Sequence, residues 1–261
     1  MTPAHSPLSN NIKLSPFISE SNEPIVDAFY DVDTLNLILH WAGSAGYSDI
    51  IFTSEQKIMY RRDRLTFLSK QSELTEAQVA ETVRWLGSEG MSVRALTGAY
   101  SDFAYTTPRD PSSGTKLRFR VNVTSVHSAR CENALAIVMR SISSKPWELS
   151  RHNLDSGYLK YCFADIGLNL IAGPMGSGKT TLAASLIQHI NTTSQKYIVS
   201  YEDPVEYDFS VADRATIPVA QTEINRGVKT FSQALSNVTR RSADVIFWGE
   251  SRDVESLHAL T

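Results

Sequence analysis

The sequence predicts two domains, an α+β domain over residues 27–144 and an α/β domain over residues 156–261. Two observations predict this division. The first part combines helical periodicity with short strands of alternating polarity, a pattern typical of an antiparallel sheet with one solvated face. The second part alternates apolar strand segments with helices, and its segment DVIFWG is apolar without alternation, which indicates a parallel sheet buried on both faces. The aperiodic, proline-containing segment between them predicts a linker over residues 145–155.

The amino-acid composition limits which classes of function are possible. The 261 residues are 42% hydrophobic, enough for two cores, and a net charge of −3 excludes a general attraction to nucleic acid or anionic lipid. Cys131 and Cys162 are in neither metal-type nor redox-type spacing, so we expect two reduced thiols. No apolar run is long enough to span a membrane, and no signal-peptide pattern opens the chain. We therefore expect a cytoplasmic protein that meets a membrane only through partners.

The first domain is expected to begin with a helix. Residues 1–26 are rich in proline, serine and asparagine and predict a disordered leader. A helix then starts near Asp33, with Gly43 and Gly46 as stop signals. Four apolar residues share one face of it: Leu35, Ile38, Leu39 and Ala42. A second helix begins at Thr75, where Gln78 stands at capping-box spacing. Six segments read as strands: DIIFT, KIMYR, LTFLS, DFAYTT, KLRFRVNVT and ALAIVMRSI.

The second domain reads as strands and helices in alternation. The expected strands are LNLIAG, KYIVSYED and DVIFWG. Residues 179–191 and 230–241 are expected to be helices, the second with Thr230 and Gln233 at capping-box spacing.

The segment GPMGSGKTT lies between the expected strand LNLIAG and the helix at Lys179. Gly173, Gly178, Lys179 and Thr180 match the pattern G-x-x-x-x-G-K-[ST], whose curled backbone N–H groups bind phosphates. The lysine bridges the terminal phosphates and the threonine hydroxyl binds Mg²⁺ in such loops. The alternative is a glycine turn without a ligand. The expected nucleotide-binding residues are Gly173, Pro174, Met175, Gly176, Ser177, Gly178, Lys179, Thr180 and Thr181.

Two acidic clusters follow expected strands, at the edge where α/β sheets bind ligands. YEDPVEY contains Glu202 and Glu206, and FWGESRD contains Glu250. A carboxylate is needed to orient or deprotonate an attacking water. Each acid taken alone reads as a solvated loop carboxylate, and it is their joint occurrence at two strand ends after the loop that favours a functional role. Gly249 stands where many P-loop enzymes carry the aspartate that holds Mg²⁺.

Arg118 and Arg120 alternate with apolar residues in KLRFRVNV and are expected on one face of a strand, with Arg140 ending the next strand. Three readings remain open for this face. It is the solvated side of a sheet, a guanidinium cluster for nucleotide phosphates, or a nucleic-acid surface.

Together these segments resemble the traffic ATPases of type IV secretion and type IV pilus machines (PilT-like), a branch of the RecA-like NTPases. The segments that carry the resemblance are GYSDIIF, LRFRVNV, AIVMRSI, GPMGSGKTT, YEDPVEY, QTEI and DVIFWGESRD. The strand pair and the RR dipeptide at residues 240–241 resemble the DotB-like, Dot/Icm and conjugative-plasmid branch most.

The resemblance implies a PAS-like N-terminal domain, a RecA-like ATPase domain, and a hexameric ring that binds ATP and Mg²⁺. It implies that Glu206, with Glu202 beside it, is catalytic, and that Glu250 with Thr180 places Mg²⁺. It also implies that Arg118, Arg120 and Arg140 reach phosphates as the ring closes. The partners it implies are inner-membrane secretion or pilus machinery, with nucleic acid unlikely.

The family pattern continues beyond Thr261, so we expect an α/β domain truncated at its C-terminus, with weak hydrolysis in isolation. The function expected is an ATP-hydrolysing motor subunit. The alternatives are a nucleotide-binding assembly subunit that does not hydrolyse, and a nucleic-acid translocase.

Overall fold

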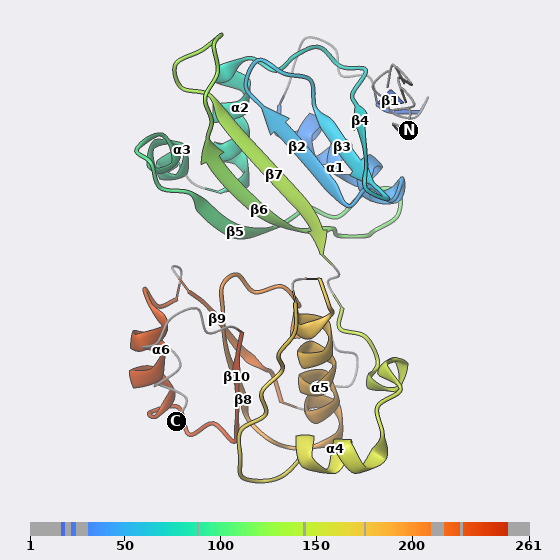
Figure 1. Cartoon of the computed structure of the whole chain (residues 1–261), viewed down its shortest axis with the longest axis vertical. Helices are drawn as coiled ribbons and strands as arrows, with labels where there is room; N and C mark the ends of the chain where they lie inside the picture. The colour runs from blue at the N-terminus through green and yellow to red at the C-terminus, as the bar shows by residue number, and fades with distance from the viewer. Residues whose placement is uncertain are drawn as a thin grey trace, which may run out of the picture.

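The computed structural model describes residues 17–18, 22–24, 31–87, 89–142, 145–174, 176–209, 217–224 and 227–249. Figure 1 shows two lobes stacked along the long axis, joined where the chain leaves strand β7 (Leu135–Ile142). The upper lobe is built on an antiparallel sheet, and the lower lobe on a small parallel sheet with helices beside it.

The upper lobe contains a seven-stranded sheet in the order β1-β4-β3-β2-β7-β6-β5. Its neighbouring strands are antiparallel except for the parallel pair of β1 and β4. Besides β7, the strands are β1 (Phe17–Ile18), β2 (Asp49–Thr53), β3 (Met59–Arg62), β4 (Leu65–Leu68), β5 (Ser101–Thr106) and β6 (Arg118–Ser125). All six expected strand segments of this domain are therefore confirmed as strands.

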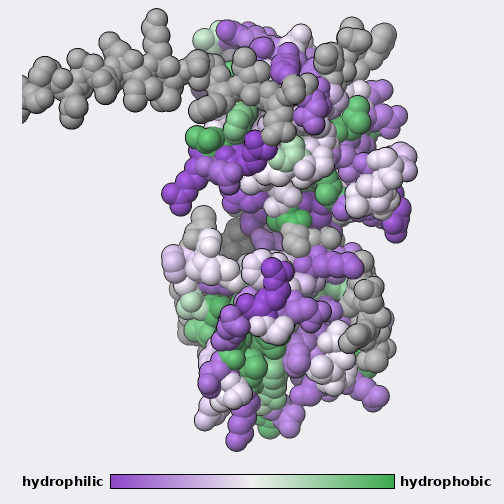
Figure 2. Space-filling view, turned by 90° about the vertical axis from the view of Figure 1, so that its right-hand side faces the viewer, coloured by the Kyte–Doolittle hydropathy of each residue, from purple (hydrophilic) through white to green (hydrophobic). Residues whose placement is uncertain are grey.

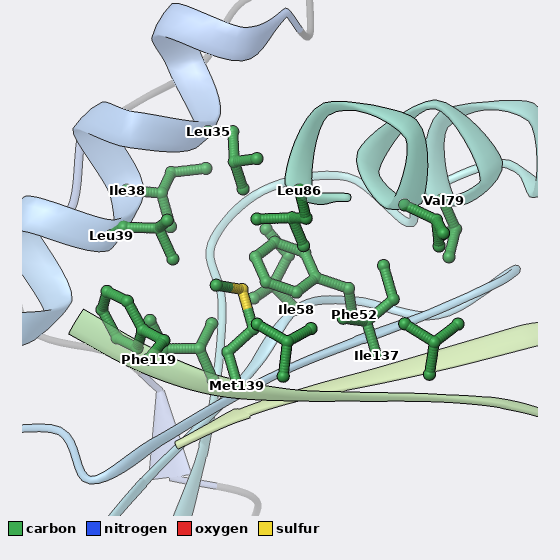
Figure 3. Packing of buried hydrophobic residues seen from close by; sticks show 14 of the residues in the cluster. Leu35, Ile38, Leu39, Phe52, Ile58, Val79, Leu86, Phe119, Ile137 and Met139 are labelled. Carbon is green, nitrogen blue, oxygen red and sulfur yellow. The ribbon is translucent and has the colours of Figure 1, made fainter. Parts of the chain in front are cut away.

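Three helices complete the upper lobe: α1 (Val32–Ser44), α2 (Glu76–Leu86) and α3 (Glu89–Leu96). Asp31 caps α1 through the Thr34 N–H, and the predicted capping box of Thr75 and Gln78 is present at α2. The four apolar residues expected on one face of α1 are all buried. Figure 3 shows α1 and α2 presenting Leu35, Ile38 and Leu86 toward the side chains of the sheet. This packing covers one face of the sheet and leaves the other for the arginines.

Part of the segment predicted as a disordered leader belongs to the fold. Phe17–Ile18 pairs with β4, and Glu23 is buried. The Glu23 carboxylate accepts hydrogen bonds from Tyr60 Oη (2.9 Å), Ser69 Oγ (2.5 Å) and Lys70 N (2.8 Å). The prediction over residues 1–26 is wrong for these residues, because a two-residue strand and one buried carboxylate produce no periodicity in the sequence.

The lower lobe has a parallel three-stranded sheet in the order β10-β8-β9. Its strands are β8 (Ile198–Glu202), β9 (Ala220–Glu223) and β10 (Val245–Trp248). Its helical segments are η1 (Leu149–His152), α4 (Ser156–Cys162), α5 (Lys179–Thr193) and α6 (Phe231–Val238). Every residue of β8 is buried, whereas β10 lies at the edge of the sheet and Ile246 is half-exposed. Burial of DVIFWG on both faces was therefore predicted wrongly.

The expected strand LNLIAG is not a strand in the described part of the chain. Leu168 and Leu170 are exposed, and hydrophobic side chains reach the surface of the lower lobe (Figure 2). Both leucines line a cavity of about 1980 Å³ that also borders β10. Apolar composition alone does not make a strand, because a strand also needs a neighbour for its backbone hydrogen bonds.

Candidate nucleotide site between two lobes

The glycine-rich loop has the backbone conformation that a phosphate cradle needs. Gly176 (φ +77°) and Gly178 (φ +89°) lie in the left-handed region that glycine adopts at little cost. A Cβ atom on Gly173 would approach Ser177 Oγ to 2.9 Å, so this turn is also tight. Met175, expected in the loop, lies outside the described residues. The loop leads directly into α5 at Lys179, and the positive end of that helix dipole favours an anion there.

Side chains at the start of α5 connect the loop to its surroundings. Lys179 Nζ donates to Pro174 O (2.9 Å), so the ammonium group lies over the loop. Thr180 is exposed, which leaves its hydroxyl accessible. Thr181 Oγ1 accepts a hydrogen bond from Tyr207 Oη (3.1 Å). The loop is thereby tied to the acidic segment that follows β8.

The two acids of that segment have different environments. Glu202 is 3% exposed and accepts hydrogen bonds from Ser200 Oγ (2.7 Å) and Gln221 Nε2 (3.1 Å). Burial raises the pKa of Glu202 in spite of these donors. The Glu206 side chain is 25% exposed, so water can reach it. Glu206 is therefore the more accessible of the two candidate bases, whereas the Glu202 carboxylate is buried and is held by its own hydrogen-bond donors.

Gly249 packs directly against the backbone of β8. Its N–H donates to Tyr201 O (2.8 Å), and a Cβ atom at this position would lie 3.2 Å from both Tyr201 O and Glu202 Cα. Backbone atoms cannot turn away as a flexible side chain can. The close contact explains why glycine, and not aspartate, stands here. Glu250, expected to place Mg²⁺, lies outside the described residues.

The expected arginines reach the acidic segment from the upper lobe. Arg118 Nη2 donates to Val205 O (2.7 Å). Arg120 Nη1 lies 3.4 Å from Glu206 Oε1, and Arg120 Nη2 lies 2.6 Å from Asp102 Oδ2. Arg120 Nε also donates to both Asp102 oxygens, at 3.2 and 3.3 Å. Asp102 therefore fixes the guanidinium group that meets Glu206.

Arg120 and Arg140 are directly opposite one another on β6 and β7. Like charges in such a pair repel, and each arginine has its own carboxylate on the outer neighbouring strand. Arg140 Nε donates to the buried Asp49 Oδ1 (2.8 Å), as Arg120 donates to Asp102. The Arg140 side chain is still 61% exposed. The result is a row of acid, arginine, arginine and acid across four strands.

Seven of the fifteen expected site residues line the cavity of about 1980 Å³ described above. Those that border it are Gly176, Lys179, Thr180, Glu202, Glu206, Arg120 and Arg140. Arg118 meets the acidic segment through Val205 instead. Asp102, Asp49 and Tyr207 take part in the site and were not among the expected residues. The only sequence signal for Asp102 is its place in DFAYTT, next to a strand expected to carry arginines.

The residues present fit a nucleotide with a divalent cation. The left-handed glycines turn the loop so that backbone N–H groups can point at phosphate oxygens, and the Thr180 hydroxyl is an oxygen ligand of the kind Mg²⁺ prefers. Within the described ranges, no group of three or more His, Cys, Asp or Glu residues could hold a metal ion by itself. Mg²⁺ bound with a nucleotide is usually held by one or two protein groups, phosphates and water.

A glycine-rich loop of the phosphate-binding pattern and an arginine-bearing sheet that contacts the same lobe define a two-lobed protein of the P-loop class. Residues 111–261 match the Type II/IV secretion system protein family, and the chain belongs to this family. It is 32% identical to the type IV pilus retraction ATPase PilT of Pseudomonas aeruginosa over 162 residues, which cover 62% of this chain and 43% of that protein. It is 27% identical to the type II secretion system ATPase E of Vibrio cholerae over 246 residues, which cover 90% of this chain and 46% of that protein.

Solved structures show the same fold. The ATPase DotB of Legionella pneumophila matches with a TM-score of 0.82 at 24% identity, over 94% of this chain and 65% of that chain. The pilus retraction motor PilT with bound ADP matches with a TM-score of 0.70 at 30% identity, over 86% of this chain and 62% of that chain. The RecA-like fold of the lower lobe is confirmed by these matches. The chain spans less than half the length of the curated relatives named above. None of the helices in the described ranges has the length and apolar character needed to cross a membrane.

Proposed function

We propose that this chain binds and hydrolyses ATP as a motor subunit of a type IV-like secretion, conjugation or pilus apparatus. One observation carries the proposal. Parts of the phosphate loop, of the acidic segment and of the arginine row border one large cavity, which is lined mostly by the lower lobe. Nucleotide binding there brings an activating carboxylate and neutralising cations to the same phosphates, which is what phosphoryl transfer to water requires.

In the proposed mechanism, backbone N–H groups of the loop and the Lys179 ammonium group bind the phosphates. Thr180 and Glu250 would hold Mg²⁺, which would supply positive charge to the phosphate oxygens. The Glu206 carboxylate accepts a proton from the attacking water, or orients that water. The buried Glu202 is the last residue of β8 and precedes the turn that carries Glu206, so we assign it a supporting role.

Arg120 gives this mechanism a link to movement. Its guanidinium group contacts Glu206 across the two lobes. The triphosphate carries more negative charge than the single Glu206 carboxylate, so it competes with Glu206 for the Arg120 guanidinium group. Nucleotide binding thus draws Arg120 away from Glu206, frees the carboxylate and pulls the upper lobe toward the loop.

We also infer a hexameric ring at the inner membrane, which is what the resemblance implies. The names of the relatives support work with secretion or pilus machinery. The PAS-like character of the upper lobe remains a prediction.

The test is nucleotide binding by Lys179→Ala, measured by fluorescence anisotropy with labelled ATP and Mg²⁺. We expect a roughly 100-fold loss of affinity, because the variant loses a charge-assisted contact to the terminal phosphates. Lys160→Ala, a lysine of α4 outside both cavities, is the matched control and should bind as the native chain does. Equal affinity of the Lys179 variant and the native chain contradicts the proposal.

A second function is favoured by the pairing of Glu206 with Arg120, which engages the candidate base. In it the chain binds nucleotide to set its shape but does not hydrolyse it. Phosphate release at saturating ATP distinguishes the two functions: a motor subunit releases phosphate over many turnovers, and an assembly subunit releases none above the rate of Lys179→Ala.

A further inference from the structure

A second cavity, of about 550 Å³, adjoins the phosphate loop. Its walls are loop residues 171–174 and 176–178, the first residues of α5, and two residues from the segment before the loop, Trp147 and His152. Small-molecule sites commonly have volumes of this order. The mechanism proposed above uses the loop and Lys179 but gives no role to Trp147 or His152.

The Trp147 ring borders the cavity and keeps 43% of its surface exposed. The Arg151 guanidinium carbon lies 4.5 Å from the centre of the Trp147 ring. The His152 ring centre is 5.8 Å away, with 35° between the two ring planes. An exposed tryptophan held by a cation and a second ring is a flat surface on which another flat group can stack.

This surface is fixed relative to the loop. His152 Nε2 lies 2.9 Å from Ser185 Oγ, and Ser185 Oγ donates its proton to Thr181 O (2.9 Å). A hydroxyl group has one proton to donate, so His152 Nε2 is the donor in its bond to Ser185. Leu149 of η1 is buried against Leu186 of α5 in the same cluster. The segment that carries Trp147 is therefore anchored to the helix that begins in the loop.

A nucleotide whose phosphates occupy the loop has a ribose and a base that need space next to it. The second cavity provides that space on the side of Thr181 and Leu182. We propose that Trp147, positioned by Arg151 and His152, stacks against the purine base of the nucleotide bound by the loop. This proposal rests on the proposed function, in that the loop must bind phosphates first.

The experiment compares ATP with tripolyphosphate, which has the phosphates but no base, as ligands of native chain, Trp147→Ala and Trp147→Phe. Alanine removes the stacking surface, and base stacking on aromatic side chains is worth enough to lower ATP affinity by roughly tenfold. Tripolyphosphate affinity should not change, and phenylalanine should restore most of the ATP affinity. Tyr100→Ala, which removes another exposed aromatic ring outside both cavities, is the matched control.

The outcomes separate the two proposals. A native chain that binds neither ligand overturns both. A native chain that binds ATP no more tightly than tripolyphosphate overturns the stacking proposal and leaves the loop proposal standing, as does an equal loss of affinity for both ligands in Trp147→Ala.

Tryptophan emission gives a second measurement if the alanine variant does not fold. ATP should change the emission of the native chain and tripolyphosphate should not, and Trp147→Phe should lose the ATP response. A full ATP response in Trp147→Phe overturns the proposal.

Discussion

Arg120 of the upper lobe and Glu206 of the lower lobe contact one another, with Nη1 3.4 Å from Oε1. The contact joins residues 86 positions apart in the chain and brings a candidate transition-state cation to a candidate base. Asp102 holds the same guanidinium group from behind at 2.6 Å. Asp102, Arg120 and Glu206 thus form one chain of contacts between the two lobes.

Asp102→Asn should lower kcat by about tenfold while KM changes less than twofold, because a loosely held Arg120 still reaches the phosphates of bound ATP but stabilises the charge that develops in the transition state poorly. Steady-state phosphate release gives both constants. The control is Glu73→Gln, which removes the acid of the exposed pair with Arg130 (2.9 Å) and should change neither constant. A variant that changes KM alone would show that Asp102 does not position Arg120 for the reaction.

Glu206→Gln should lower turnover by about 100-fold or more, the usual contribution of a general base, while ATP still binds. Because the substitution removes a negative charge near the phosphates, the affinity for ATP should stay equal or become tighter. Phosphate release and labelled-ATP anisotropy measure the two effects separately. Glu132→Gln, at an exposed position away from the cavity, is the control. Near-native turnover in the Glu206 variant excludes this residue as the base.

Gly249→Ala should lower the free energy of unfolding by about 1–3 kcal/mol, because its Cβ atom is forced against the backbone of β8. The matched control is Gly90→Ala in α3, where a Cβ atom meets nothing within 4 Å and the higher helix propensity of alanine should stabilise. Urea unfolding measures both. Equal stability of Gly249→Ala and the native chain would mean that the close packing is not needed.

Glu202→Gln should stabilise the protein at neutral pH. Burial raises the folded-state pKa of Glu202 above its ordinary value, so the folded state binds this proton more tightly than the unfolded state does. The contribution of Glu202 to stability is therefore full below its ordinary pKa and is lost as pH rises through the raised pKa. Glutamine keeps an oxygen for the Ser200 and Gln221 donors and carries no charge.

Thermal unfolding from pH 4 to pH 8 should show the Glu202→Gln variant and the native chain converging at the acid end, with the variant higher at pH 8. A constant difference over the whole range would show that the buried charge of Glu202 does not set the pH dependence.

Features that depend on a few neighbouring residues could be predicted from the sequence. The buried face of α1, the capping box at Thr75 and the alternation around Arg118 and Arg120 are each set within one turn or one strand pair. The loop at Gly176 and Gly178 belongs with them, because its turns depend on glycines at fixed spacing.

Features that depend on distant neighbours could not be predicted. Residues 168–173 have the composition of a strand but are not paired with one in the described part of the chain. Glu23 looks like a residue of a polar tail and is buried by Tyr60 and Ser69. Trp147 looks like part of a linker, yet it borders the phosphate loop because η1 packs on α5.

The sequence by itself determined that this protein has a glycine-rich loop of the phosphate-binding pattern, acids after strands, and arginines on one face of a sheet, since these are local patterns of residue type and spacing. Only the tertiary structure decided that Arg120 meets Glu206, that Asp102 holds it, and that Gly249 has no room for a side chain. The reason is physical: each of these contacts depends on how two separately built sheets and their lobes lie against each other, and that is fixed by packing across long stretches of chain.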